Sequence, residues 1–550
     1  MISFMKSEVV KLFIRRITAA LLCLSIIFSF SACGKKGPKN ADKQISFNLT
    51  AEPKTLDPQI ASDSSAIIAV EALYEGLARL GSDQKAYPGV AEKWESNSDN
   101  TVFTFTLRSS AKWTDNKTSV TADDFVYAFR RALTPSTGSK TCSSMFCIKN
   151  AKEVNSGALA PDQLGVTAKD AHTLVIKLNY SYPDFPVLTA SAVFMPCNQK
   201  FFEGTSGRYG LERKYLLGNG PFEIDGKYGW EHGKYLNLVR SDTYSGNRKP
   251  LPSNIKFTIE GKNNAITDPV AALKAGTVDA IAVPAEKIAA ATAAGCTLTS
   301  FEDTTWGLCF NTQSDTMKSL NIRKAFIQAF DRAKVMKYLP DNVSRADNII
   351  CPSTTLQGKS YRSLVNNGAF YLKQDKNPAA LLAAGLNEIS TPELKSISVI
   401  CPDDTNIKLM LNEMIATWNS KFNNYFNIEP LDRAKLDERI KSGNYQIALC
   451  PIQPDSDGPL SALSLFKSGV TGNPAKLNDP TFDTMLTDAQ KKSGSDAVTA
   501  FAAAEKYLND HAVFYPLYYE KHYYAAAAGV TGVVFHPYSM GIDFIQTGKS

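Results

Sequence analysis

Residues Phe103–Pro135, FTFTLRSSAKWTDNKTSVTADDFVYAFRRALTP, constrain the local fold more than any other stretch of this chain. Apolar residues alternate with threonines over Phe103–Leu107, which is the period-two pattern of a strand buried on one face. Asp115–Asn116 supplies turn chemistry, because both residue types tolerate positive φ and bond to their own backbone. Thr121–Asp124 is a T-x-x-D capping box that opens a helical apolar pattern, and Pro135 ends that helix. The stretch therefore predicts a strand, a turn and a capped helix.

The same stretch resembles a family signature. The order A-K-W-x-D-x-x-x-x-V-T-A-x-D-F-V-Y-A over Ala111–Ala128 is similar to that of the oligopeptide-binding proteins of peptide ABC importers. These are lipid-anchored or periplasmic receptors, also called extracellular solute-binding proteins of family 5. Asn116 stands where the family usually has Gly, a replacement that a turn tolerates.

Further stretches extend the resemblance from about Ile45 to the C-terminus. They are EPKTLDP at Glu52–Pro58, LGNGPF at Leu217–Phe222, AGTVD at Ala275–Asp279, Trp306–Gln313 and YPLYY at Tyr515–Tyr519. Periodicity also predicts a helix over Ile67–Leu80, a helix and then a strand over Pro269–Ile281, and a helix over Asn406–Trp418.

The alternation of strands and helices favours an α/β fold with mixed sheets. The resemblance implies more: a periplasmic-binding-protein type II-like fold, with two lobes around a cleft, two hinge strands and an extra domain beside the first lobe. The boundaries it implies are 1–32 for a signal peptide, 33–43 for a tether, 44–74, 216–303 and 522–550 for lobe I, 75–215 for the extra domain, and 304–521 for lobe II.

The N-terminus reads as an export signal. A basic region ending in Arg15–Arg16 precedes the apolar run Ile17–Phe30, which is short for a membrane span. Small residues before Cys33 resemble the lipobox of bacterial lipoproteins, so we expect Cys33 to become the lipidated first residue. The alternative is a transmembrane anchor. With Cys33 lipidated, Gly34–Asn40 would serve as a flexible tether between the membrane and the domain.

Composition excludes several other classes of function. The net charge is +6, and the first 32 residues contribute +3 of it, so the remaining chain offers no strongly basic surface for nucleic acid. Five histidines in 550 residues argue against a histidine-built metal or catalytic site, and we expect no cofactor and no metal. Eight cysteines follow Cys33; disulfides, for instance between Cys142 and Cys147, and buried free thiols are both open.

Asp455 is the leading candidate for a ligand-binding residue. In the family, a carboxylate in a Trp-x-Ala-Asp-Tyr-x-x-Pro run binds the α-ammonium of the peptide. Counting forward from Tyr445 places Asp455 on that acidic position and Pro459 on the motif's proline. A buried carboxylate suits this role because an unpaired charged ammonium is costly to bury.

The surroundings of Asp455 depart from the motif, since Ile452, Pro454 and Ser456 replace Trp, Ala and Tyr. An alternative interpretation makes Asp455 and Asp457 surface turn residues within a Pro-Asp-Ser-Asp-Gly-Pro sequence. A calcium loop is a third interpretation, but two aspartates fall short of that pattern.

Seven other residues are candidates through the resemblance. Ser62, Asp63 and Ser64 fall where family members run backbone along the peptide. Tyr127 matches a ligand-facing tyrosine, Trp306 opens a hinge strand, Cys309 lies near a position that is acidic in some relatives, and Tyr518 belongs to the late YPLYY motif. A neutral Cys309 would favour less basic ligand side chains. Packing inside the core is the alternative for Tyr127, Trp306 and Tyr518.

The function implied is that of a non-catalytic, lipid-anchored receptor in the bacterial cell envelope, facing the periplasm or exterior. It would bind oligopeptides and deliver them to the permease and ATPase subunits of an ABC importer, acting as a monomer. Motifs of common hydrolases and P-loop enzymes are absent from the sequence, so we expect no enzyme activity. The alternatives are the same fold with another solute (nickel chelate, haem or oligosaccharide), or a surface adhesin or sensor lipoprotein.

Overall fold

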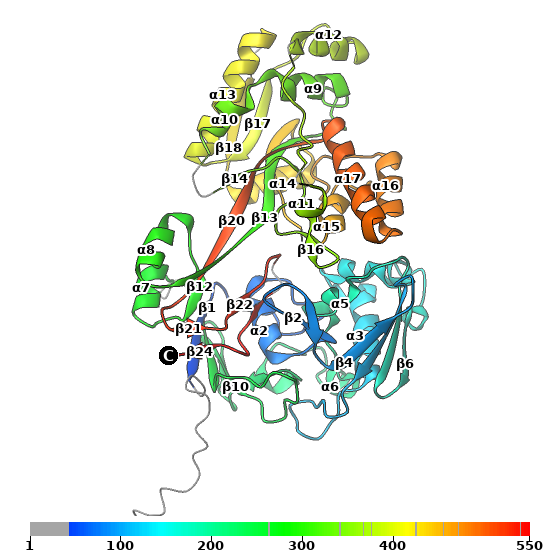
Figure 1. Cartoon of the computed structure of the whole chain (residues 1–550), viewed down its shortest axis with the longest axis vertical. Coiled ribbons are helices and arrows are strands. Elements are labelled where there is room, and N and C mark those ends of the chain that lie inside the picture. Colours follow the sequence, from blue (N-terminus) through cyan, green and yellow to red (C-terminus); the bar gives the residue numbers. More distant parts are fainter. Residues whose placement is uncertain are drawn as a thin grey trace, which may run out of the picture.

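The computed structural model describes residues 43–550 except 262–264, 340–342, 367, 376, 424–425, 455, 471 and 539–540. Two lobes are stacked along the long axis and joined by two long strands, β13 and β20 (Figure 1). β13 is Thr297–Phe310 and β20 is Phe514–Ala526, and they pair antiparallel along most of their length. β13 begins in the lower lobe and β20 begins in the upper lobe, so each strand crosses from one lobe to the other.

One sheet runs through both lobes in the order β18-β17-β19-β13-β20-β12-β1-β11-β10-β8. In the lower lobe β1 pairs parallel with both β11 and β12, and β12 pairs antiparallel with β20. The lower-lobe strands and helices are β1 Gln44–Leu49, α2 Ser64–Leu73, β8 Phe222–Ile224, β9 Trp230–Glu231, β10 Tyr235–Arg240, β11 Asn254–Ile259, α7 Pro269–Lys274, β12 Ala280–Ala282 and α8 Ile288–Ala293. The helix and strand predicted over Pro269–Ile281 are confirmed as α7 and β12.

The core of the lower lobe contains residues from both ends of the chain. The rings of Phe47, Phe257 and Phe544 pack edge to face, with centroids 5.5–6.3 Å apart. Short strands complete the C-terminal segment: β21 Val530–Thr531, β22 Val534–Phe535, β23 Ile542–Asp543 and β24 Gly548–Lys549.

The helix predicted over Ile67–Leu80 is too long. α2 ends at Leu73, and Ala78–Leu80 instead forms β2, which pairs with β3 (Ala86–Pro88). At the break the backbone bonds across the fold and not along the helix: the N–H of Gly220 donates to the oxygen of Leu73 over 2.9 Å, and the N–H of Glu75 donates to Oδ1 of Asn219 over 3.1 Å. Periodicity alone does not reveal such a tertiary contact.

The strand, turn and helix predicted over Phe103–Pro135 are confirmed. β5 (Val102–Leu107) buries the side chains of Phe103, Phe105 and Leu107, and α3 (Ala122–Leu133) follows. Asn116 adopts a φ of 58° in the turn, and the backbone N–H of Thr121 donates to Oδ2 of Asp124 over 2.8 Å at the helix start.

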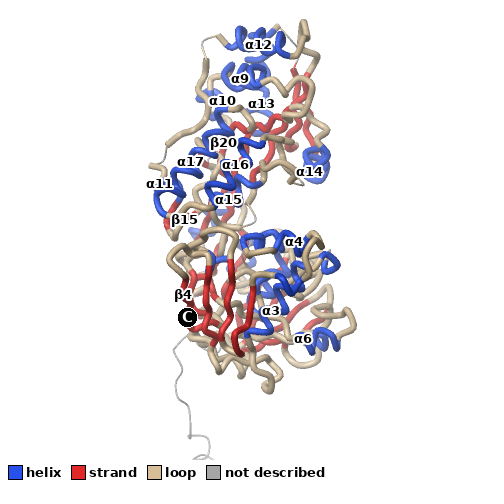
Figure 2. The backbone as a smooth tube through the Cα atoms, turned by 90° about the vertical axis from the view of Figure 1, so that its right-hand side faces the viewer, coloured by secondary structure: helices blue, strands red, loops and turns tan. Residues whose placement is uncertain are grey.

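These elements belong to a separate four-stranded sheet in the order β4-β5-β7-β6, seen beside α3 and α4 in Figure 2. Its aromatic core includes Phe103 and Phe105 against Phe185. The remaining elements here are β4 Ala91–Ser96, α4 Ala151–Asn155, β6 Val166–Asp170, β7 Thr173–Lys177, α5 Phe185–Leu188 and α6 Gln199–Gly204.

The upper lobe covers its part of the large sheet on both faces. Leu308 and Phe310 face a core with Phe326 and Trp418, whereas Cys309 between them faces a second core. Strands buried on both faces read as continuous apolar runs, as β17 and β19 do. The strands are β14 Ser344–Arg345, β15 Thr355–Leu356, β16 Lys359–Ser360, β17 Ile397–Pro402, β18 Phe426–Leu431 and β19 Ile447–Ile452.

The helices of the upper lobe divide between these two cores. They are α9 Leu320–Ala329, α10 Arg332–Met336, α11 Tyr361–Leu364, α12 Pro378–Glu388, α13 Thr405–Phe422, α14 Arg433–Ser442, α15 Pro459–Ser464, α16 Pro480–Gln490 and α17 Gly494–Asp510. The helix predicted over Asn406–Trp418 is confirmed as part of α13.

A buried ion pair links α17 to α11, and a hydrogen bond links α17 to the segment that precedes α11. Nη2 of Arg362 lies 2.5 Å from Oε2 of Glu505, and Oε1 of Glu505 accepts the backbone N–H of Ile350 over 2.7 Å. Glu505 is completely buried.

Glu505→Ala is expected to lower the free energy of unfolding by about 3–5 kcal/mol, because it leaves the Arg362 guanidinium buried without a counterion. The double variant Arg362→Met, Glu505→Leu removes both charges and should lose less. Urea denaturation followed by circular dichroism measures both. A loss below about 1 kcal/mol in the single variant would contradict a structural role for the pair.

The eight cysteines of the described residues are all free thiols, and every one except Cys296 is buried. Cys142 and Cys147, the pair suggested by spacing, instead donate their thiol protons to backbone oxygens of Ser139 and Ser144. Burial raises the pKa of Cys147 to about 12, so its reactive thiolate is scarce at neutral pH.

A thiol titration checks this assignment on protein that begins at residue 43. Because thiols react as accessible thiolates, we expect Cys296 alone to react quickly with Ellman's reagent in the native state. Eight thiols should react after denaturation without reductant. Six or fewer under those conditions would show that disulfides form.

Candidate functional site

The lobes meet around a cavity of about 350 Å³, called the central cavity below. The lower lobe contributes residues of α2 and, just before that helix, Ser62, whereas the upper lobe contributes the residues that follow β19. The lining residues are Ala61, Ser62, Ile67, Glu71, Thr141, Ser144, Leu188, Ser191, Ala192, Val193, Gln453, Pro454, Ser456 and Tyr538. The cavity therefore needs both lobes to exist.

Ser62 lines the central cavity, and its predicted place along the peptide backbone stays a prediction. Ser64 lines a neighbouring cavity of about 420 Å³ beside β1 and α7. Asp63 caps α2, because its Oδ1 accepts the backbone N–H of Ala66 over 2.9 Å. Among the described residues, its Oδ2 has no hydrogen-bond partner and is closed off from solvent.

Asp455 and Cys33 lie outside the described residues. The immediate neighbours of Asp455, Pro454 and Ser456, line the central cavity opposite Ser62. The roles predicted for Asp455 and Cys33 stay predictions.

Trp306 and Tyr518 stack with ring centroids 6.0 Å apart and planes 10° from parallel. They line a cavity of about 920 Å³ along the hinge strands, called the hinge cavity. Nε1–H of Trp306 donates to Oε2 of Glu520 over 2.7 Å. Both rings are almost fully buried and also belong to the upper core.

The hinge cavity carries paired charges on its strands. Nδ1 of His522 lies 2.7 Å from Oδ1 of Asp303, and this hydrogen bond raises the pKa of His522 above its ordinary value. Lys521 pairs with Glu302 at 3.2 Å. Charges on both strands are therefore compensated locally.

Two predicted residues are placed elsewhere. Tyr127 lines a cavity of about 650 Å³ with Arg131, Phe202 and Tyr209, to which no upper-lobe residue contributes. Cys309 is completely buried in the upper core near Tyr445. The expected effect of Cys309 on ligand side chains is therefore not supported, because strand alternation turns this thiol into the core.

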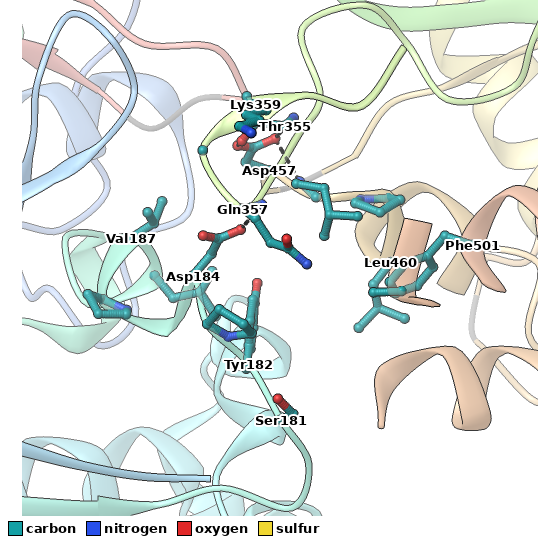
Figure 3. Close-up of a pocket in the computed structure, with 18 of the residues that line it drawn as sticks. Ser181, Tyr182, Asp184, Val187, Thr355, Gln357, Lys359, Asp457, Leu460 and Phe501 are labelled. Atoms are coloured by element: carbon teal, nitrogen blue, oxygen red, sulfur yellow. Dashed lines mark hydrogen bonds between the residues drawn. The ribbon is translucent and has the colours of Figure 1, made fainter. Parts of the chain in front are cut away.

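A further cavity of about 500 Å³, the outer cavity, lies between the four-stranded-sheet region and the upper lobe (Figure 3). Its apolar wall includes Tyr182, Val187, Leu460 and Phe501. It shares Leu188 with the central cavity, so the two are adjacent.

Two carboxylates accept backbone hydrogen bonds from the loop Thr355–Lys359, which lines the outer cavity (Figure 3). Oδ2 of Asp184 accepts the backbone N–H of Gln357, and Oδ1 of Asp457 accepts that of Thr355 over 2.7 Å. Burial raises the pKa of Asp184 to about 6 and also raises that of Asp457. Asp457 is thus a loop anchor and not the surface turn residue considered above.

Sequence reasoning also missed Tyr538, which links the C-terminal segment to the upper lobe. Its hydroxyl hydrogen-bonds with Oγ1 of Thr354 at 3.0 Å and with Sγ of Cys351 at 3.4 Å. The residue adopts a φ of 60°, which a tyrosine rarely does. The sequence around Tyr538 has no periodicity that could have indicated this contact.

Within the described part of the chain, no group of three or more histidine, cysteine or acidic side chains is arranged to hold a metal ion. A separate survey of the same residues finds no helix with both the length and the apolar character needed to cross a bilayer.

Two lobes joined by two hinge strands, with cavities between them, define a two-lobed binding protein of the type II fold. The family model for bacterial extracellular solute-binding proteins, family 5 (middle), matches residues 85–474. The chain belongs to this family.

Known relatives support both the two-lobed fold and the family membership. The dipeptide-binding protein DppE of Bacillus subtilis is 27% identical over 94% of this chain and 96% of its own length. The periplasmic murein peptide-binding protein MppA of Escherichia coli is 28% identical over 91% and 92%, respectively. The substrate-binding domain of an oligopeptide ABC transporter from Bacillus anthracis superimposes with a TM-score of 0.70 at 25% identity, covering 93% of this chain and 100% of that one.

Tyr538→Phe is expected to lower the free energy that stabilises the contact with the upper lobe by about 0.5–1.5 kcal/mol, because the variant lacks the hydrogen bond to Thr354. Hydrogen–deuterium exchange of residues 351–355 should accelerate several-fold in the ligand-free protein. Tyr228→Phe, at an exposed tyrosine, is the matched control. Unchanged exchange in the Tyr538 variant would show that this contact does not hold the segment.

Proposed function

We propose that this protein is a lipid-anchored extracytoplasmic receptor that binds oligopeptides between its lobes and delivers them to an ABC importer. The observation that carries the proposal is the central cavity. It is lined by Ser62 from one lobe and by the two neighbours of Asp455 from the other. The names of DppE and MppA, which bind peptides, support the same ligand class.

The proposed binding mode uses backbone pairing together with one charged anchor. An extended peptide that pairs with exposed backbone gains affinity that does not depend on its side chains. Asp455 would bind the α-ammonium of the peptide and fix its direction, since a charge-assisted hydrogen bond is stronger than a neutral one. Ser62, Asp63 and Ser64 would follow the peptide backbone.

Binding would favour the closed arrangement of the lobes, because ligand contacts from both sides exist only in that state. Closure would bend β13 and β20, as in other hinge motions. The register between these strands shifts between Glu302 and Thr304 and again between Trp306 and Gly307. We propose that these irregularities are where the strands bend.

The partners in this proposal are the permease and ATPase subunits of the importer, which would spend the ATP. The receptor itself would act as a monomer and catalyse nothing. A lipid on Cys33 would hold it at a membrane facing the periplasm or exterior, through the tether 33–43. The domain boundaries given above are part of this proposal.

Mass spectrometry of the purified, signal-less protein under denaturing conditions tests the ligand class. We expect short peptides to be released from the wild type and depleted in Asp455→Ala, because that variant lacks the carboxylate that would bind their α-ammonium. Asp496→Ala, which removes an exposed carboxylate from α17, is the control and should keep its peptides.

Peptides held equally by all three proteins would remove Asp455 from the site and leave the peptide assignment intact. A wild type that releases no peptide, and that shows no thermal shift with a peptide mixture, would overturn the proposed function.

A further inference from the structure

Glu71 lies on α2 and lines the central cavity, four residues before Glu75 on the same chain segment. Its Oε1 is closed off from solvent and has no hydrogen-bond partner among the described residues. Gly541 packs against the stem of this side chain so closely that a Cβ there would lie 2.5 Å from Cγ of Glu71. The stem of this side chain is therefore held in place, while Oε1 has no partner within the described part of the chain.

The charged groups around Glu71 are already paired with one another. Nε of Arg79 lies 2.8 Å from Oε1 of Glu75, and Nη1 of Arg79 lies 3.8 Å from Oδ2 of Asp543. Arg248 pairs with the same Asp543 oxygen at 3.0 Å.

Two uncharged side chains, those of Tyr244 and His536, also lie near these charged groups. The hydroxyl of Tyr244 donates to Oε1 of Glu75. Burial lowers the pKa of His536 to about 4, so this imidazole is neutral at pH 7. Three carboxyls thus face two guanidiniums, and Glu71 is the carboxyl for which the described residues supply no ion-pair partner.

No lysine or arginine lines the described part of the central cavity. Its other lining groups are hydroxyls, an amide and apolar side chains. With a volume of about 350 Å³, it falls in the size range of small-ligand pockets, roughly 300–1,000 Å³. A cation that compensates Glu71 therefore has room to enter from the ligand side.

We propose that Glu71 binds a cationic nitrogen of the ligand in the central cavity. This inference rests on the proposed function, because the ligand is taken to be a peptide. Glu71 would then determine specificity in addition to Asp455, because its carboxylate selects ligands that carry an ammonium or guanidinium group.

The ionisation of Glu71 gives the proposal a second consequence. Burial raises the pKa of Glu71 to about 8, although the nearby Arg79 opposes that shift. In the ligand-free protein the carboxyl is mostly protonated at pH 7. A bound cation stabilises the carboxylate, so binding releases a proton below pH 8, and affinity rises with pH until about pH 8 is reached.

Titration calorimetry on wild type and Glu71→Gln tests the proposal with three probes. Tri-alanine carries only an α-ammonium, N-acetyl-tri-lysine carries only side-chain ammoniums, and N-acetyl-tri-alanine carries neither. Glu71→Gln keeps the size of the side chain, and Glu438→Gln on exposed α14 is the matched control. Measurements in two buffers of different ionisation enthalpy count the protons released.

We expect Glu71→Gln to weaken at least one cationic probe about ten- to a hundredfold, as loss of a hydrogen bond to a charged group does. N-acetyl-tri-alanine should change less than about twofold, and proton release at pH 7 should fall. A loss confined to tri-alanine identifies the α-ammonium as the bound group, and one confined to N-acetyl-tri-lysine identifies a side chain.

Two results would overturn the inference, and they are distinguishable. If the probes bind the wild type and Glu71→Gln alike, with equal proton release, Glu71 does not bind the cation and the peptide function stands. If none of the probes and no peptide mixture binds the wild type, the proposed function fails and this inference fails with it.

Discussion

The pairing of β13 with β20 is the contact on which the rest of this structure depends. The two strands are hydrogen-bonded from Thr297 opposite Ala526 to Cys309 opposite Phe514, and so they extend through both lobes. At one end β20 pairs with β12 of the lower lobe, and at the other β13 pairs with β19 of the upper lobe. Every cavity between the lobes is therefore positioned by one two-stranded ribbon. A ribbon of two strands bends more readily than a wide packed sheet, which suits the lobe closure proposed above.

Much of the fold was predictable because local chemistry determines it. The capping box at Thr121, the turn at Asn116 and the alternation over Phe103–Leu107 each specify an element from neighbouring residues alone, and all are found. The helix over Ile67–Leu80 was predicted too long because the backbone from Leu73 onward bonds to Asn219 and Gly220, more than a hundred residues away.

The candidate site was less predictable, because contacts between residues distant in sequence decide which side chains reach it. Ser62 reached the central cavity, but Cys309 faces the core because the upper sheet is covered on both sides. The significance of Tyr538 and Glu71 comes from segments that meet only after folding. A carboxylate on an apolar helix such as α2 was the one available hint for Glu71.

The aromatic contact between Phe47 and Phe544 has a consequence for the order of folding. These rings lie at opposite ends of the described chain and share one core with Phe257. Closing so long a loop lowers the conformational entropy of the chain, and only the contacts that form once the loop is closed compensate for that loss. The lower lobe is therefore completed last, after the upper lobe has all of its own strands. During synthesis from the N-terminus, β1 must wait for almost the whole polypeptide before its core is closed.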